Sequence, residues 1–307
     1  MKKNPRIIFM GTPDFAVPSL DILVENNYNV VAVITATDKR GGRGGKKLIE
    51  SAVKKYAISK NIPVLQPSNL KNEGFIKELR SYQADLQIVV AFRMLPEVVW
   101  AMPPLGTFNL HGSLLPKYRG AAPINWAIMK GEKQTGVTTF FIEKEIDTGT
   151  IILQKHLPIG PNESAGALHD RMMCLGANTV LETVKLIEQG DLQPNLQDHQ
   201  AATPAPKLFK DNCQINFNQT TQVIYDFIRG LSPYPAAWAY LSGETWKILA
   251  TKMEFEAHKH QPGSLHTDGR KFLKVATTDG FVSILKLQVP GKRRMDVLDF
   301  LNGWKGV

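Results

Sequence analysis

Short runs of β-branched and aliphatic residues alternate with segments of helical periodicity throughout residues 1–189. The runs that suit strands lie at residues 6–10, 30–34, 64–65, 86–91 and 106–110. Helical spacing of apolar residues is found at residues 16–25, 48–60 and 165–189. Near-continuous apolar runs are typical of parallel strands buried on both faces, and each parallel pair needs a crossover connection. The pattern therefore predicts an α/β fold with a Rossmann-like, doubly wound, mostly parallel sheet covered by helices on both faces.

The composition changes after residue 189. Residues 190–206 are rich in Gln, Asn, Pro and Ala and have little periodicity, which predicts a linker. Beyond it, a helix is predicted at residues 220–231, followed by strands at residues 237–241, 245–253, 271–276 and 281–288. Several short strands separated by Gly-containing turns indicate a small OB-like β-barrel. We expect one domain at residues 1–189, a linker at 190–206 and a second domain at 207–307.

The chain is basic, with 37 Lys and Arg against 28 Asp and Glu and a net charge of +9. The positive charge is spread over both predicted domains, which suits a large polyanion better than a small acidic ligand. The apolar runs are too short to cross a bilayer. The two cysteines, Cys174 and Cys213, have no metal-ligand spacing and are too few for a disulfide framework. We therefore expect a cytoplasmic protein without a membrane segment or a metal site, and a monomer because no interface stripe is evident.

Asn109 and His111 are the strongest candidates for a chemical role. They lie two residues apart near the end of a predicted strand, so their side chains share one face. In open α/β sheets, ligands bind at the carboxyl ends of the strands. An amide that donates to a developing oxyanion and an imidazole that moves protons near neutral pH suit acyl transfer. The residue types alone fit equally well a polar strand end that holds a hydrogen-bonded histidine.

Asp147 lies in an Asp147-Thr148-Gly149 turn between strands predicted at residues 140–142 and 150–153. A carboxylate in this place could orient the imidazole and stabilise its positive charge. Asp before Thr-Gly is also ordinary turn chemistry. Considered alone, the turn interpretation is the stronger one. Beside the Asn-x-His strand end, however, Asp147 becomes a candidate partner of His111.

Residues 37–47 form a Gly-rich loop with one acidic residue and five basic ones, Lys39, Arg40, Arg43, Lys46 and Lys47. Four glycines make such a loop flexible when free, and it could become ordered on a phosphate backbone. It is not a nucleotide-binding P-loop, because the Gly-Lys-Ser/Thr ending is absent. A solvated basic loop is the alternative that the residues themselves favour.

The aromatic residues of the second domain are expected in its core. Trp238, Tyr240, Trp246 and Phe255 lie in or beside predicted strands. Large aromatic side chains contribute most of the buried area in small domains. We expect them to pack inside the barrel and not to serve as stacking platforms for bases.

The strand end and the turn together resemble the signature of the 10-formyltetrahydrofolate-dependent formyltransferases. The matching residues are Asn109-x-His111, the run Ser113-Leu114-Leu115-Pro116-x-Tyr118-Arg119-Gly120, and Asp147-Thr148-Gly149. The resemblance implies that Asn109 and His111 contact the formyl oxygen and stabilise the tetrahedral oxyanion. It implies that Asp147 holds His111 and helps to move protons. It further implies that 10-formyltetrahydrofolate is the cosubstrate and that its site is lined by Ser113, Leu114, Leu115 and Pro116, with Leu95 and Pro96 against the pterin.

Three other segments narrow the resemblance to the branch of this family that formylates methionyl-tRNA. Residues 10–18, 120–124 and 230–238 are similar to that branch, so the resemblance extends over essentially the whole chain. It implies initiator methionyl-tRNA as the acceptor and a second domain that helps to hold tRNA. Arg43 aligns with the arginine of a loop that probes the acceptor end. The resemblance therefore implies that the basic loop binds tRNA and is not merely solvated. Its tRNA-binding candidates are Lys39, Arg40, Arg43, Lys46 and Lys47.

The chain departs from the family pattern at Arg93. Residues 89–96 read Val-Val-Ala-Phe-Arg-Met-Leu-Pro, and Arg93 stands where the family more often has a small residue. The departure concerns the shape of the folate-side loop and not the class of enzyme. The alternatives within the class are a sugar-nucleotide N-formyltransferase and a formyltetrahydrofolate hydrolase, and the basic Gly-rich loop argues against both. A noncatalytic RNA-binding protein is a further alternative, and the intact Asn109, His111 and Asp147 argue against it.

Overall fold

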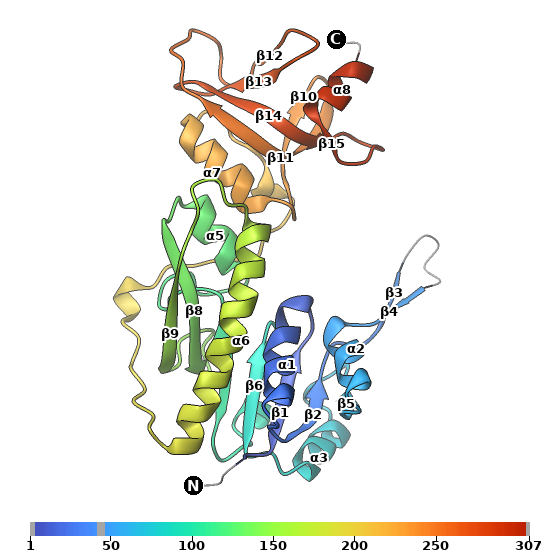
Figure 1. Cartoon of the computed structure of the whole chain (residues 1–307), viewed down its shortest axis with the longest axis vertical. Helices are drawn as coiled ribbons and strands as arrows, with labels where there is room; N and C mark the ends of the chain where they lie inside the picture. The colour runs from blue at the N-terminus through green and yellow to red at the C-terminus, as the bar shows by residue number, and fades with distance from the viewer. Residues whose placement is uncertain (1–3, 42–46, 305–307) are drawn as a thin grey trace. The chain divides into compact units, whose positions relative to one another are not determined.

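The computed structural model describes residues 4–41 and 47–304, which form two compact units (Figure 1). Unit 1 comprises residues 1–120, 136–157 and 169–204. Unit 2 comprises residues 121–135, 158–168 and 205–307. Each unit is therefore assembled from three separate stretches of the chain.

Unit 1 is built on a seven-stranded sheet whose strands follow the order β5-β2-β1-β6-β7-β8-β9. The strands are β1 (Ile7–Gly11), β2 (Val30–Ile34), β5 (Val64–Leu65), β6 (Leu86–Val90), β7 (Thr107–His111), β8 (Gln134–Phe141) and β9 (Ile151–Pro158). The pairs from β5 through β7 are parallel, and β8 runs antiparallel to β7. The helices are α1 (Val17–Glu25), α2 (Ala52–Ser59), α3 (Glu73–Ser81), α4 (Glu97–Trp100) and α6 (Ala165–Gln189). The predicted Rossmann-like, mostly parallel fold is confirmed.

Both faces of this sheet are buried. Ile8 and Met10 of β1 point to one face and belong to a core cluster that includes Phe75 of α3. Ile7 and Phe9 point to the other face and are also fully buried. A strand whose successive side chains are all buried needs cover on both sides, which explains the continuous apolar run in the sequence.

The prediction of a helix at residues 48–60 was wrong about where the helix begins. Residues Lys47–Ile49 form strand β4, which pairs antiparallel with β3 (Lys39–Gly41). The helix begins only at Ala52, because the Ser51 side chain caps it by accepting a hydrogen bond from the Lys54 backbone N–H at 3.0 Å. The apolar residues Leu48 and Ile49 mimic helical spacing but lie on the exposed ribbon.

Unit 2 contains a curled antiparallel sheet in the order β10-β11-β14-β13-β12, with β15 paired to β14 (Figure 1). The strands are β10 (Ala237–Leu241), β11 (Glu244–Glu254), β12 (Leu265–Thr267), β13 (Leu273–Ala276), β14 (Phe281–Gln288) and β15 (Met295–Asp296). The helices are α5 (Pro123–Met129), α7 (Thr221–Leu231) and α8 (Val297–Gly303). The second part of the predicted fold class, a small antiparallel unit that follows the α/β unit, is confirmed.

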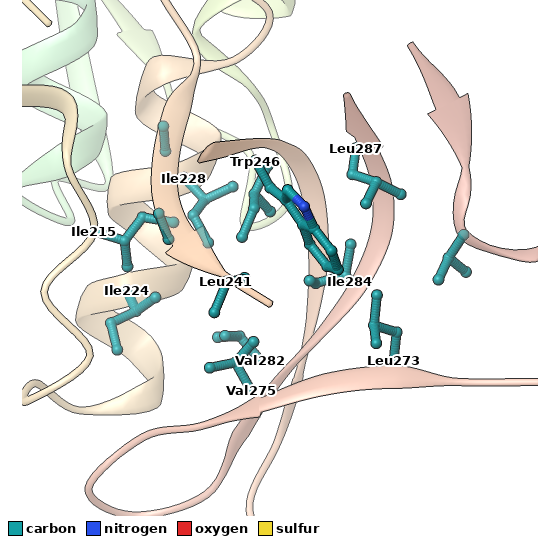
Figure 2. Packing of buried hydrophobic residues seen from close by; sticks show 14 of the residues in the cluster. Ile215, Ile224, Ile228, Leu241, Trp246, Leu273, Val275, Val282, Ile284 and Leu287 are labelled. Carbon is teal, nitrogen blue, oxygen red and sulfur yellow. The ribbon is translucent and has the colours of Figure 1, made fainter. Parts of the chain in front are cut away.

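The core of unit 2 lies between α7 and the inner face of the sheet. Ile224 and Ile228 of α7 pack in the same buried cluster as Trp246, Ile284 and other strand residues (Figure 2). Helix α7 begins at the Thr220 cap, whose side chain accepts from the Val223 N–H. The apolar side chains on one face of α7 and the alternate, inward-pointing side chains of the strands therefore pack together in a single core.

The prediction that four aromatic residues share this core was wrong for two of them. Trp246 is 2% exposed, but Tyr240 is 67% exposed and Phe255 is 66% exposed. In β10, Ala239 and Leu241 point inward. Tyr240 lies between them and must point to the opposite face, because the side chains of a strand alternate.

No helix in the part of the chain that the structure describes combines the length and apolar character needed to cross a membrane.

Unit 2 contains a cluster of three histidines, His258, His260 and His266, whose rings are in contact. We expect this cluster to make unit 2 less stable at acid pH. Burial, aided by the nearby His260, Lys274 and His258, lowers the pKa of His266 below its usual 6.5. Lys274 in turn pairs with Glu254 and Glu256, each at 3.3 Å. As the pH falls below about 6.5, the unfolded chain binds a proton at His266 that the folded unit resists, so the free energy of unfolding should decrease.

This pH effect can be measured through amide hydrogen exchange in β13 and β14 at pH 7.5 and pH 5.5, after correction for the intrinsic exchange rate. We expect less protection at pH 5.5, and a smaller difference in the His266→Gln variant, which cannot titrate at this position. An equal pH dependence in both proteins would show that another group is responsible.

Candidate active site

Asn109 and His111 lie at the carboxyl end of β7, where the sequence predicted them. Their neighbours Phe108 and Leu110 are buried on the other face of the strand. Strands β1, β6 and β7 are parallel and end at the same edge. The chain passes from β1 to β2 and β5 on one side of β1, and then crosses over to β6 and β7 on the other side. Such a reversal of strand order opens the crevice in which α/β proteins bind ligands.

The structure brings His111 and Asp147 together. Atom Nδ1 of His111 lies 3.6 Å from Oδ2 of Asp147, and both side chains are largely buried. The other ring nitrogen, Nε2, lies 2.8 Å from the backbone oxygen of Tyr118. A carbonyl oxygen can only accept, so Nε2 carries a proton. The Gly120 N–H donates to the same Asp147 Oδ2 at 2.8 Å, which holds the carboxylate against residues 113–120, the signature loop.

The side-chain amide of Asn109 is available to a ligand. Asn109 is half-buried, and within the described residues its side chain makes no hydrogen bond to the protein. A partly exposed amide without a protein partner is free to hydrogen-bond a ligand. Its N–H₂ group can donate to an oxyanion that forms beside the strand end.

The Asp147 turn is confined by the close approach of a neighbouring strand. Asp147 adopts a left-handed backbone conformation with φ 55°. A Cβ atom at Gly149 would lie 1.7 Å from the backbone oxygen of Phe141 in β8. The sequence indicated only a turn preference for this glycine, whereas the structure shows that no side chain fits there.

We expect Gly149→Ala to lower kcat by about 10²-fold, because the added methyl group must push the turn, and with it Asp147, away from β8. Steady-state turnover assays, with circular dichroism to verify folding, would measure this effect. Gly303→Ala is the control, since a Cβ at Gly303 meets no atom within 4 Å. Normal turnover in Gly149→Ala would show that the turn position is unimportant.

The first part of the signature loop, from Ser113 to Pro116, is anchored to the edge of the sheet. The Ser113 hydroxyl donates to the Lys117 oxygen at 2.6 Å, and Gln154 of β9 donates to the Leu115 oxygen at 2.9 Å. Ser113 and Leu115 are buried, whereas Leu114 and Pro116 are half-buried. The proposed folate contacts of these four residues remain predictions.

A pocket of about 690 Å³ lies beside the loop that follows β6. Its lining includes the predicted pair Leu95 and Pro96 but not the four residues Ser113 to Pro116. Met94 and Val98, also in the lining, are 70% and 43% exposed. Lys144 joins the lining from the same β8–β9 loop that carries Asp147. The pocket thus presents apolar surface to an incoming ligand, together with the cationic side chains of Lys71, Arg93 and Lys144 and the carboxylate of Glu97.

Arg93, the departure from the family pattern, forms part of the pocket wall. Its guanidinium donates to the backbone oxygen of Ser68 at 2.9 Å and to that of Pro67. These bonds tie the loop after β6 to the segment after β5. The larger side chain at this position therefore connects two sides of the pocket.

The basic loop is partly described. Lys39 and Arg40 lie in β3 and Lys47 lies in β4, and all three are exposed on a two-stranded ribbon that stands away from the sheet of unit 1 (Figure 1). Arg43 and Lys46 lie outside the described residues. The described ends of the predicted flexible loop are paired with each other, and their tRNA role stays a prediction.

Gln197 is a residue of the site that the sequence did not reveal. It lies in the predicted linker, yet it is 6% exposed and hydrogen-bonded to the Asp147 turn. The surrounding Pro, Asn and Ala residues gave no periodic signal for a buried position. Among the described residues, no group of three or more His, Cys, Asp or Glu side chains could hold a metal ion.

Comparison with known proteins identifies the family of the chain. Residues 5–184 match the family model for formyl transferases, and residues 207–305 match the model for the formyl transferase C-terminal domain. The methionyl-tRNA formyltransferase of Parabacteroides distasonis is 56% identical over 100% of this chain and 98% of its own length. That of Flavobacterium johnsoniae is 55% identical over 97% of this chain and 96% of its own length.

A solved structure supports the fold. An N-formyltransferase from Helicobacter canadensis, in complex with folinic acid and dTDP-3-aminofucose, has a TM-score of 0.69 and 22% identity over 91% of this chain and 98% of its own. The full-length relatives and the two matching family models lead to one conclusion: the chain belongs to the methionyl-tRNA formyltransferase family.

Proposed function

We propose that this protein transfers the formyl group of 10-formyltetrahydrofolate to the α-amino group of initiator methionyl-tRNA, which forms N-formylmethionyl-tRNA for translation initiation. The observation that carries the proposal is the free Asn109 amide on the same strand end as the His111–Asp147 pair. The two full-length relatives supply the acceptor, since both are named for methionyl-tRNA.

The site favours direct attack by the amine without a covalent enzyme intermediate. The neutral amine nitrogen forms a bond to the formyl carbon, the bond from this carbon to N10 of folate breaks, and the proton lost by the amine balances the one gained by N10. In the sequence, the hydroxyl nearest to His111 belongs to Ser113, which is fully buried and donates to the Lys117 oxygen. It is therefore not available as a nucleophile.

Asn109 and His111 act on the charge that develops in this step. The Asn109 N–H₂ donates to the oxyanion, and the His111 ring places positive charge near it. Asp147 stabilises that charge from the side of Nδ1, 3.6 Å away. Because the Nε2 proton is directed to the Tyr118 oxygen, the Nδ1 side of the ring, where Asp147 lies, is the side suited to carry protons between the attacking amine and N10 of folate.

The pocket beside the loop after β6 is where we place the folate. Met94, Leu95, Pro96 and Val98 offer apolar surface for a flat heterocycle. Lys144 is a cation suited to the carboxylates of the glutamate tail. The folinic acid bound by the Helicobacter canadensis enzyme supports a folate cosubstrate for this fold.

We place the tRNA on the basic parts of the chain. The ribbon carries Lys39, Arg40 and Lys47 on its exposed surface, and such side chains bind phosphates. We propose that Arg43 and Lys46 extend this surface. In this proposal residues 1–189 carry the catalytic machinery, residues 190–206 connect it to the second domain, and residues 207–307 help to bind the tRNA. We propose that the protein acts in the cytoplasm. The monomeric state stays a prediction.

The proposed function is tested by offering several acceptors with 10-formyltetrahydrofolate. We expect N-formylation of initiator methionyl-tRNA, and no product with uncharged tRNA, with dTDP-amino sugars or with water. Formylation of the amino sugar would replace the proposed acceptor by a sugar nucleotide. Release of formate alone would indicate a hydrolase. Binding of tRNA without any formyl transfer would indicate a noncatalytic RNA-binding protein.

A further inference from the structure

The predicted linker returns to the catalytic unit and braces its active site. Asn195 exchanges backbone hydrogen bonds with Ile151 of β9, at 2.9 and 2.8 Å. Farther along, the Thr203 hydroxyl accepts from the Tyr118 N–H at 2.9 Å, and the Thr203 oxygen accepts from the Arg119 N–H at 2.9 Å. These contacts fix the segment on both sides of Gln197.

Every hydrogen-bonding position of the Gln197 side chain is used. Its Nε2 group donates to the backbone oxygens of Asp147 and Gly149, at 2.9 and 2.8 Å. Its Oε1 atom accepts from Nε and Nη2 of Arg119, at 3.1 and 2.6 Å. Carbonyl oxygens only accept and a guanidinium only donates, so the orientation of the amide is determined by its partners.

The two sides of this amide bind the two segments that hold His111 in place. On one side is the turn that supplies the Asp147 carboxylate to Nδ1. On the other is Arg119, which lies between Tyr118, the acceptor for Nε2, and Gly120, the donor to Asp147. Gln197 thus joins the turn and the signature loop through a buried side chain at 6% exposure.

We infer that Gln197 is a positioning residue for formyl transfer, which acts by keeping the Asp147 carboxylate opposite the imidazole of His111. The inference rests on the proposed function. Asp147 has a left-handed backbone conformation, which a free turn would leave readily, and two of the carbonyl oxygens of its turn are tied to Gln197. Loss of these bonds lets the carboxylate drift, and a misplacement of about 1 Å is enough to lower turnover strongly.

The test compares Gln197→Met with the unaltered protein in the formylation of methionyl-tRNA. Methionine keeps the length of the side chain but removes all four hydrogen bonds. We expect kcat to fall by about 10–100-fold, with KM for both substrates nearly unchanged. We also expect the inflection in the pH profile of kcat to move in the same direction as in Asp147→Asn. The matched control is Gln200→Met, an exposed glutamine of the same segment, which should keep normal kcat.

A double-mutant cycle separates positioning from a structural role. If Gln197 acts through Asp147, Gln197→Met should lower kcat much less in the Asp147→Asn background than in the unaltered protein. Should Gln197→Met fail to fold, Gln197→Glu serves instead, because it keeps the shape and the acceptors for Arg119 but turns an oxygen toward two carbonyl oxygens. We expect it to lose kcat to a similar extent.

Normal kcat in a folded Gln197 variant, or a fully additive cycle with an unshifted pH profile, would overturn the inference and leave the proposed function standing. Absence of methionyl-tRNA formylation by the unaltered protein would overturn both.

Discussion

The His111→Ala variant should formylate methionyl-tRNA about 10²–10⁴-fold more slowly than the unaltered protein. The substitution removes the ring whose Nδ1 faces Asp147 at 3.6 Å and whose Nε2 carries a proton. Asn109→Ala should cost about 10²–10³-fold in kcat, the usual effect of removing one donor to an oxyanion. Single-turnover assays with saturating substrates would measure the chemical step directly.

Neither variant should unfold the protein, because Asn109 makes no side-chain hydrogen bond in the described part of the chain and His111 lies at the very end of its strand. His156→Ala is a suitable control, since this histidine is exposed on β9 and has no role in the proposed reaction. Turnover within a few-fold of normal in both site variants, each shown to be folded, would remove the basis for placing the chemistry at this strand end.

The second large effect is expected in the core of unit 2. Trp246→Ala should destabilise this unit by about 3–5 kcal/mol. The Trp246 ring is 2% exposed and packs edge-on against Phe300, at a centroid distance of 5.0 Å. Its indole N–H has no hydrogen-bond partner in the described structure, so the predicted loss comes from packing and the cavity that is left. Native-state hydrogen exchange of β11 and β14 would report the change for unit 2 separately.

Tyr240→Ala is the matched control for this prediction. Tyr240 is also aromatic and lies on the strand that pairs with β11, but it is 67% exposed. We expect its removal to change the unfolding free energy by less than about 0.5 kcal/mol, as for most surface substitutions. Equal protection from exchange in the two variants would show that burial of Trp246 does not support the core.

Local sequence patterns were sufficient for elements whose own residues carry the signal. Strand β2 has the predicted bounds, because Val30–Ile34 is a continuous apolar run. Strand β8 was predicted only at residues 140–142, yet it spans Gln134–Phe141. Its first half includes Gly136, where a Cβ atom would lie 2.1 Å from the Lys155 oxygen. Thr135, Val137, Thr138 and Thr139 also favour a strand, so the local signal began before residue 140 and the close pairing with β9 adds to it.

Helix α3 was missed although part of its signal was present. Asn72 caps it by accepting from the Phe75 N–H at 3.0 Å, and Phe75 and Leu79 are buried four residues apart. The charged residues between them obscured the apolar spacing. Such short amphipathic helices owe their stability mainly to the sheet on which they pack.

By itself, the sequence determined the fold class and the chemical groups of the candidate site. Apolar runs with helical segments between them predicted a parallel sheet, and the residues Asn109, His111 and Asp147 resemble one enzyme family closely enough to predict formyl transfer. These inferences depend on the types of residue and their order, which a sequence contains.

Only the tertiary structure decided how these groups are held. The 3.6 Å approach of Asp147 to His111 joins residues 36 positions apart. The β8–β9 loop leaves β8 after Phe141, which pairs with Phe108 near the start of β7, and the loop then carries Asp147 back to the His111 side chain at the end of β7. The Gln197 brace comes from still farther along the chain, in a segment without periodic signal. Contacts between residues distant in sequence depend on the path of the whole chain, and no local pattern specifies them.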